Sequence, residues 1–95
     1  MKIYKYNLNA IGLNLIQTYV GAEILSAGVD PCGSMCVWML VDTNQPAAER
    51  AIIVVGTGWD LSDGWSNPRF IGTVNMGPYM WHVFDEGEPL TREAS

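Results

Sequence analysis

Polar and apolar residues alternate along the first third of this chain, a pattern that is typical of half-buried β-strands. The alternation predicts strands over residues 2–7, 13–19 and 22–29. The first of these carries charged residues within its alternation, which suits a strand at the edge of a sheet. Residues 13–19 also fit a short helical turn, and we favour the strand.

The middle of the chain predicts a β-hairpin with a deeply buried second strand. Residues 30–34 combine Asp, Pro and Gly, which favour tight turns. Residues 35–41 are a continuous apolar run, which indicates a strand covered on both faces. Such double burial requires a second layer or a second subunit. A polar connection follows over residues 42–50, and Pro46 is placed to begin a short helical turn within it.

The last third of the chain predicts further strands around a long loop. Residues 51–55 form a β-branched strand, residues 60–68 a polar loop, and the final hairpin joins residues 69–75 to 79–84. The chain thus contains about six or seven strands and no long helix. This predicts an all-β fold, in the form of a small antiparallel β-sandwich or open barrel.

Length and composition indicate one domain that associates with itself. The chain has 95 residues, and we expect one compact domain over residues 1–85, followed by an acidic, disordered tail over residues 86–95. The hydrophobic content of 48% is high for so short a chain. Apolar strand surface beyond what one small core buries favours a homodimer or a higher homo-oligomer.

The charge of the chain argues against binding to polymeric nucleic acid. The net charge is −5, and residues 1–84 carry four Lys and Arg side chains against six Asp and Glu. Binding to DNA or RNA needs a basic patch, because affinity comes largely from counterions that several cations release. A small anion is different, since one or two local cations neutralise it whatever the overall charge.

The sequence offers little chemistry for catalysis or metal binding. Cys32 and Cys36 lack the second ligand pair that a structural zinc site needs, and His82 is the only histidine. No Ser or Cys lies in a recognisable nucleophile motif, and most acidic residues fall in predicted turns. We therefore expect a protein that is not an enzyme and that needs no metal or cofactor.

The sequence shows no targeting or membrane segment. Its first residues read as a strand without the apolar region of a signal peptide, and no stretch approaches the roughly 20 apolar residues of a membrane-spanning helix. We expect a protein without a membrane partner, in a reducing cytoplasm, with both cysteines as free thiols.

The main candidate for a binding site is the step from the strand over residues 51–55 into Gly56-Thr57-Gly58-Trp59. Glycines one residue apart allow positive φ and leave amide N–H groups open to a close ligand. Trp59 adds an aromatic face beside those donors. An anion cradle next to a stacking platform is what a nucleotide-like molecule needs. The structural alternative is a β-bulge and turn with a core tryptophan.

Five other residues complete the candidate site. Arg50 and Arg69 stand at strand entries beside the glycine turns, where each can reach a phosphate, and the alternative for each is a solvated charge. Tyr4, Tyr6 and Trp65 supply rings for base stacking, which contributes about 1 to 3 kcal/mol per base. The alternative for the tyrosines is core packing. Trp65 is either a loop anchor or part of a ligand or partner surface.

Several segments, taken in this order, resemble a family of small proteins encoded mostly by phages. They are MKIYKY (residues 1–6), GAEILS (21–26), CVWMLVD (36–42), GTGW (56–59), FIGTV (70–74) and WHVF (81–84). Together they span most of residues 1–85. Family members often carry His after Gly-Thr-Gly, where this chain has Trp59, and this departure bears on the identity of the ligand.

The family is similar to phage sponge proteins that sequester nucleotide immune signals, such as the cyclic dinucleotides of the bacterial CBASS defence. The resemblance implies a protein in the cytoplasm of the infected bacterial host that binds a cyclic nucleotide without cleaving it. A dimer is able to enclose such a two-fold ligand. The alternative function is a non-catalytic protein–protein inhibitor of a host defence protein, or an accessory virion component.

Overall fold

The computed structural model describes residues 1–9, 11–61 and 68–87, and the regular structure in these ranges is entirely β. The strand segments expected from the sequence are all present, so the all-β prediction is confirmed. The strands, in chain order, are β1 (Lys2–Asn7), β2 (Gly12–Tyr19), β3 (Glu23–Val29), β4 (Met35–Val41), β5 (Ala47–Gly56), β6 (Arg69–Met76) and β7 (Tyr79–Gly87).

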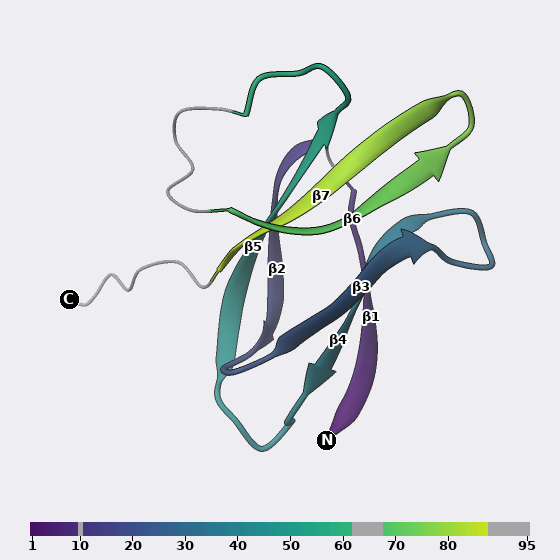
Figure 1. The fold of residues 1–95 in the computed structure, drawn as a ribbon. Helices are drawn as coiled ribbons and strands as arrows, with labels where there is room; N and C mark the ends of the chain where they lie inside the picture. The colour runs from purple at the N-terminus through teal and green to yellow at the C-terminus, as the bar shows by residue number, and fades with distance from the viewer. Residues whose placement is uncertain (10, 62–67, 88–95) are drawn as a thin grey trace.

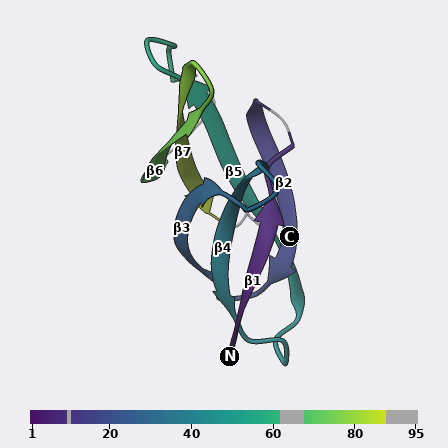
Figure 2. The ribbon, with the colours of Figure 1, turned by 90° about the vertical axis from the view of Figure 1, so that its right-hand side faces the viewer.

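The strands form two antiparallel sheets that pack as a sandwich (Figures 1 and 2). One sheet has the order β1-β4-β3 and the other the order β2-β5-β7-β6. The pairs β3–β4 and β6–β7 are hairpins, whereas β1 pairs with β4 and β2 pairs with β5 over longer separations along the chain. The edge strands β3 and β6 lie side by side, so the sheets meet along that side (Figure 1).

The core lies between the sheets and is built from inward-facing residues of the central strands. Val37, Met39 and Val41 of β4 are fully buried, and Ile52 and Val54 of β5 belong to the same cluster. Their spacing of two residues places them on one face of each strand. Full burial of such a side chain stabilises the fold by about 1.5 to 3 kcal/mol.

Both faces of β4 are covered, as its continuous apolar sequence predicts. On the face away from the core, Cys36 is fully buried, and its thiol donates to Gly28 O at 3.7 Å. Trp38 on the same face is half-buried and packs against Gly28, where an added Cβ would lie 3.3 Å from the ring. Part of the cover on this outer face therefore comes from within the same sheet. Cys32 is exposed, and both cysteines are free thiols.

The prediction of a helical turn that starts at Pro46 is wrong. β5 begins at Ala47, and residues 47–50 pair in register with residues 16–19 of β2. The local sequence Ala-Ala-Glu-Arg favours helix. Pairing with β2 outweighs that preference, because strand formation depends on cross-strand neighbours more than on intrinsic propensity.

The last strand is longer than its sequence pattern predicts. β7 runs past Phe84 to Gly87, and Gly87, with a φ of +97°, pairs with Ala51 across an irregularity in the register. The expected domain boundary after residue 85 therefore falls inside a strand. Residues 88–95 of the expected tail lie outside the described residues.

No helix in the described ranges is long and apolar enough to cross a membrane.

Candidate functional site

Two glycines with different roles shape the turn that follows β5. Trp59 N–H donates to Gly56 O at 3.1 Å, which closes the turn. Gly58 has a φ of +87°, a left-handed conformation that favours glycine. Gly56 provides space, because the Trp59 indole lies across it and an added Cβ would stand 2.9 Å from Cε2. The predicted turn is therefore present, with Trp59 at the end of the strand and 53% exposed.

Strand β7 supplies a second wall beside this turn. The register of β5 and β7 sets Trp81 opposite Gly56, and the turn between β6 and β7 brings Tyr79 to the same end of the sheet. The rings of Trp59 and Trp81 meet edge to face, with centroids 5.5 Å apart and planes at 85°. The Tyr79 ring lies 6.2 Å from that of Trp81, with the planes at 43°.

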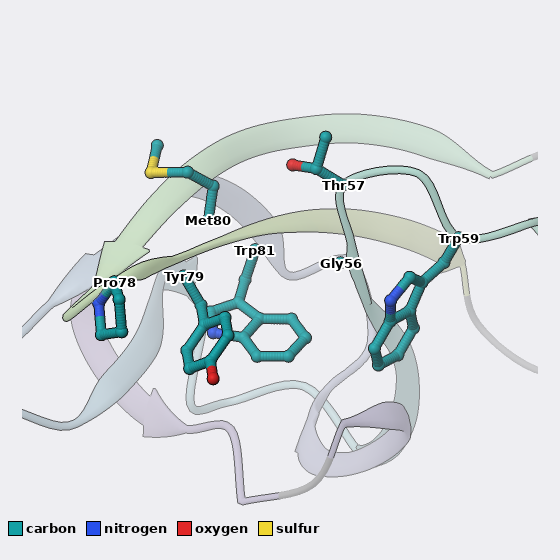
Figure 3. A pocket seen from close by; sticks show the side chains of 7 residues that line it. All are labelled: Gly56, Thr57, Trp59, Pro78, Tyr79, Met80 and Trp81. Carbon is teal, nitrogen blue, oxygen red and sulfur yellow. The ribbon is translucent and has the colours of Figure 1, made fainter.

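The turn and the strand line an open cavity of about 630 Å³ (Figure 3). Figure 3 shows the rings of Tyr79, Trp81 and Trp59 in a row along it. Tyr79 is 64% exposed, so the cavity is open to solvent on that side. Its lining carries no charged side chain among the residues that the structure describes. The lining residues are Gly56, Thr57, Trp59, Pro78, Tyr79, Met80 and Trp81.

A hydrogen-bonded histidine holds Thr57, a polar member of the lining. Thr57 Oγ1 lies 2.6 Å from Nε2 of His82, and Nδ1 of the same ring lies 3.0 Å from Thr73 Oγ1. Because a hydroxyl either donates or accepts, the arrangement accommodates both neutral tautomers of the ring. A hydroxyl beside an imidazole is also the arrangement of an activated nucleophile. The described lining thus places one hydroxyl within hydrogen-bond distance of an imidazole.

Arg50 lies inside the sandwich, away from the cavity. Its Nε and Nη2 donate to the two carboxylate oxygens of Asp85, each at 3.0 Å, and its Nη1 donates to Ala22 O at 2.7 Å. Burial raises the pKa of Asp85, but the hydrogen bond and charge of Arg50, together with hydrogen bonds from Gly87 N–H and Arg69, hold that pKa below its usual value. The structure therefore does not bring Arg50 to the predicted phosphate contact.

Arg69 is accessible but belongs to another part of the surface. It pairs with Asp85 across β6 and β7, whereas the cavity lies where Trp81 pairs with Gly56. Its side chain is 76% exposed, and its Nη2 lies 3.4 Å from Asp85 Oδ2. Arg69 borders a second cavity of about 280 Å³, whose lining includes the acidic Glu23 and Asp85. The structure therefore does not bring Arg69 to the aromatic cavity either.

Two of the predicted stacking residues, Tyr4 and Tyr6, are not brought to the cavity. Tyr4 and Tyr6 are half-buried and pack against the core between the sheets. The Tyr6 hydroxyl lies 3.0 Å from Thr18 Oγ1, and the Tyr4 ring meets that of Tyr19 edge to face at 6.4 Å. These contacts correspond to the core-packing alternative. Trp65 lies outside the described residues.

Sequence reasoning did not assign the β7 wall to the site. One signal was available, because Tyr79 and Trp81 are two residues apart in a strand and so present their rings on one face. The sequence does not reveal the register that sets Trp81 opposite Gly56. That register joins two segments that are far apart along the chain into one lining.

Among the described residues, no group of three or more His, Cys, Asp or Glu side chains is arranged to hold a metal ion.

No curated protein and no solved structure matches the chain. A protein family matches residues 1–93 of the chain, and its description is "Domain of unknown function (DUF7352)". The match spans nearly the whole chain, including every strand of the sandwich. The protein therefore belongs to the DUF7352 family.

Proposed function

We propose that this protein is a sponge that sequesters a cyclic nucleotide signal, with a base of the nucleotide held in the aromatic cavity and no bond cleaved. The observation that carries the proposal is the row of Trp59, Trp81 and Tyr79 along one cavity. Its volume of about 630 Å³ falls within the range of small-molecule sites. Stacking on such rings contributes about 1 to 3 kcal/mol per base.

The geometry of the cavity favours a flat ligand with a polar end. Trp59 and Trp81 stand nearly perpendicular, so a base that stacks on one ring meets the edge of the other. Thr57 also lines the cavity, and its hydroxyl is held by His82 Nε2 at 2.6 Å. Because the described lining carries no cation, the phosphates of the ligand remain at the open mouth, in contact with water.

Calorimetry with a panel of cyclic di- and trinucleotides tests the proposal. We expect at least one member to bind, and we expect Trp59→Ala and Tyr79→Ala to weaken binding roughly tenfold to a hundredfold, which corresponds to the loss of one stacking contact. Phe70→Ala is the matched control, because Phe70 is an exposed aromatic residue that does not line the cavity. Absence of binding to every member contradicts the proposal.

Chromatography of the recovered nucleotide separates sequestration from catalysis. A sponge returns the nucleotide unchanged after incubation. The contact between Thr57 and His82 makes the opposite result worth measuring, since an imidazole next to a hydroxyl supports nucleophilic attack. Cleavage that is lost in Thr57→Val shows an enzyme and contradicts the proposal. Intact nucleotide in both proteins supports it.

A second candidate function is inhibition of another protein through the same surface. Tyr79, Trp59 and Met80 are 64%, 53% and 43% exposed, and a cluster of exposed aromatic residues and methionine is typical of protein interfaces. Under this alternative, a host protein or virion component binds the wild-type protein but not Tyr79→Ala. Because this partner would bind the residues that line the cavity, nucleotides that bind the cavity should compete with it. Absence of competition shows that the partner binds a different surface.

A further inference from the structure

Strand β2 is an edge strand of its sheet. It lies at the end of the sheet order β2-β5-β7-β6 and pairs only with β5 among the described strands. Its eight residues, Gly12–Tyr19, keep one continuous register with β5. By contrast, the pairings of β3 with β4, of β5 with β7 and of β6 with β7 each contain an irregularity. β2 therefore presents a long, regular row of backbone groups.

This edge lacks the features that usually prevent pairing between molecules. Edge strands are commonly protected by charged side chains, proline or a β-bulge. The sequence of β2, GLNLIQTY, contains no charged residue and no proline. The other edge strands differ, because β1 carries Lys2 and Lys5, while β3 and β6 lie against each other.

Two of the β2 side chains that point away from the core are leucines, and they lie beside the polar Gln17 on the same face. Leu13 and Leu15 are 44% and 53% exposed, and the adjoining Ile11 is 57% exposed. The alternate residues Asn14 and Thr18 face inward and are buried. Ile16, between them, belongs to the core, whereas the two leucines leave large apolar side chains in contact with solvent. Burial of these outer apolar residues against a second surface would remove them from water and stabilise the contact.

We propose that two copies of this protein pair through β2, antiparallel and about a two-fold axis, to form one continuous sheet of eight strands. A two-fold axis sets each strand against its own copy, so any charge on the strand meets the like charge of the partner. β2 is free of such repulsion because it carries no charge. With the axis near Asn14, Leu13 of each copy lies opposite Leu15 of the other, so that the leucines of both copies form one apolar stripe between the paired strands.

Measurement of molar mass in solution tests this interface. We expect the wild-type protein to have twice the 10.5 kDa mass of one chain. Leu13→Lys combined with Leu15→Lys places cations along the stripe and should give a folded monomer, since both side chains point away from the core. Ile3→Lys is the control, because Ile3 is also an exposed apolar residue, on the edge strand β1. This variant should remain a dimer.

Mixing experiments make the result independent of any loss of stability. A chain with Glu at both positions 13 and 15 is also expected to be a monomer, and equimolar mixing with the Lys chain should restore a species of double mass. Hydrogen exchange provides a second readout: amides of β2 that face away from β5 exchange slowly in the dimer and quickly in the Lys variant. A wild-type monomer at high concentration overturns the proposal. A dimer that persists in the Lys variant, or that is lost in Ile3→Lys, also overturns it.

Discussion

The indole of Trp59 lies so close to the backbone of Gly56 that a methyl group on Gly56 would stand 2.9 Å from Cε2 and 3.0 Å from Nε1 of the ring. The same tryptophan donates its backbone N–H to Gly56 O. The position of one cavity wall is thus set by contact with backbone rather than with a flexible side chain. Any side chain at position 56 must therefore move the wall.

Replacement of Gly56 by Ala is expected to displace Trp59 and to open the cavity. A contact of 2.9 Å is shorter than van der Waals contact, so the ring must turn away or the turn must shift. Overpacking of this kind destabilises proteins by about 1 to 3 kcal/mol. We expect a change in tryptophan fluorescence, a lower free energy of unfolding in chemical denaturation, and weaker binding of any ligand of the cavity.

Gly72→Ala is the matched control for this substitution. An added Cβ on Gly72 meets only the Ala27 Cβ, at the ordinary distance of 3.9 Å. We expect this variant to retain the wild-type fluorescence. Equal effects of the two substitutions indicate that loss of glycine itself, and not the contact with Trp59, is responsible.

Replacement of Arg50 by Met should destabilise the fold strongly. The Arg50 and Asp85 side chains are 10% and 4% exposed, so removal of the cation leaves a buried carboxylate and an unsatisfied Ala22 carbonyl. Loss of one partner of a buried ion pair costs about 3 to 5 kcal/mol. Denaturant titration at neutral pH measures this loss.

Two further variants separate the buried pair from the exposed charge on the same carboxylate. Arg69→Ala removes a cation that is 76% exposed and 3.4 Å from Asp85, so it should change the free energy of unfolding by less than about 1 kcal/mol. Arg50→Met combined with Asp85→Leu should recover part of the stability, since no buried unpaired charge remains at this pair. A double variant less stable than Arg50→Met alone contradicts this account.

Two lowered carboxyl pKa values should make the fold sensitive to acid. The hydrogen bond from Lys5 and the backbone N–H of Ser34 hold the pKa of Asp30 below its ordinary value of 3.8, and the pKa of Asp85 is also lowered. A lowered folded-state pKa contributes stability that is present above the unfolded value and lost as pH falls through the folded value. The free energy of unfolding should therefore decrease as the pH falls below about 4.

The partner of Asp30 adds a dependence at the alkaline end. The hydrogen bond to Asp30 raises the pKa of Lys5 above 10.5, so its contribution is present below that pH and is lost as pH rises further. Lys5→Met should flatten both limbs of the stability curve, while the acid dependence due to Asp85 remains. Identical curves for Lys5→Met and wild type contradict the assignment.

The two cysteines should react at different rates with a thiol reagent. Cys32 is exposed, whereas Cys36 is fully buried, and burial raises the pKa of its thiol. We expect one thiol to be modified in the folded protein and both to be modified in denaturant. Cys32→Ser should abolish the rapid phase. Mass spectrometry of the folded protein after brief exposure provides the count, and rapid modification of Cys36 contradicts the buried position.

The strands could be predicted from the sequence because each buries at least one face, and burial leaves a visible pattern of apolar residues along the chain. It misplaced the start of β5, since residues 47–50 favour helix locally and extend only because they pair with β2. It also treated Arg50 as available for a ligand. That residue is satisfied by Asp85, which is 35 positions away, and no local pattern reveals such a partner.

The turn at Gly56 was recognisable from sequence, but the cavity beside it was not. Two glycines and a tryptophan after a β-branched strand indicate a special backbone. The opposite wall depends on the register between β5 and β7, in which one residue of slippage would turn the Trp81 ring to the other face. The site is therefore a property of the completed sheet, whereas the turn is a property of its own sequence.

The topology of the second sheet also sets the order in which the protein can assemble. β5 is an inner strand that pairs with β2 and β7. β7 is the last of the described strands to be synthesised, so one edge of β5 stays unpaired until the residues of β7 have left the ribosome. Pairings between distant segments form slowly, after the local hairpins. The Trp59 turn gains its second wall only at that final step. A nascent chain that has not yet formed β7 therefore lacks the aromatic cavity.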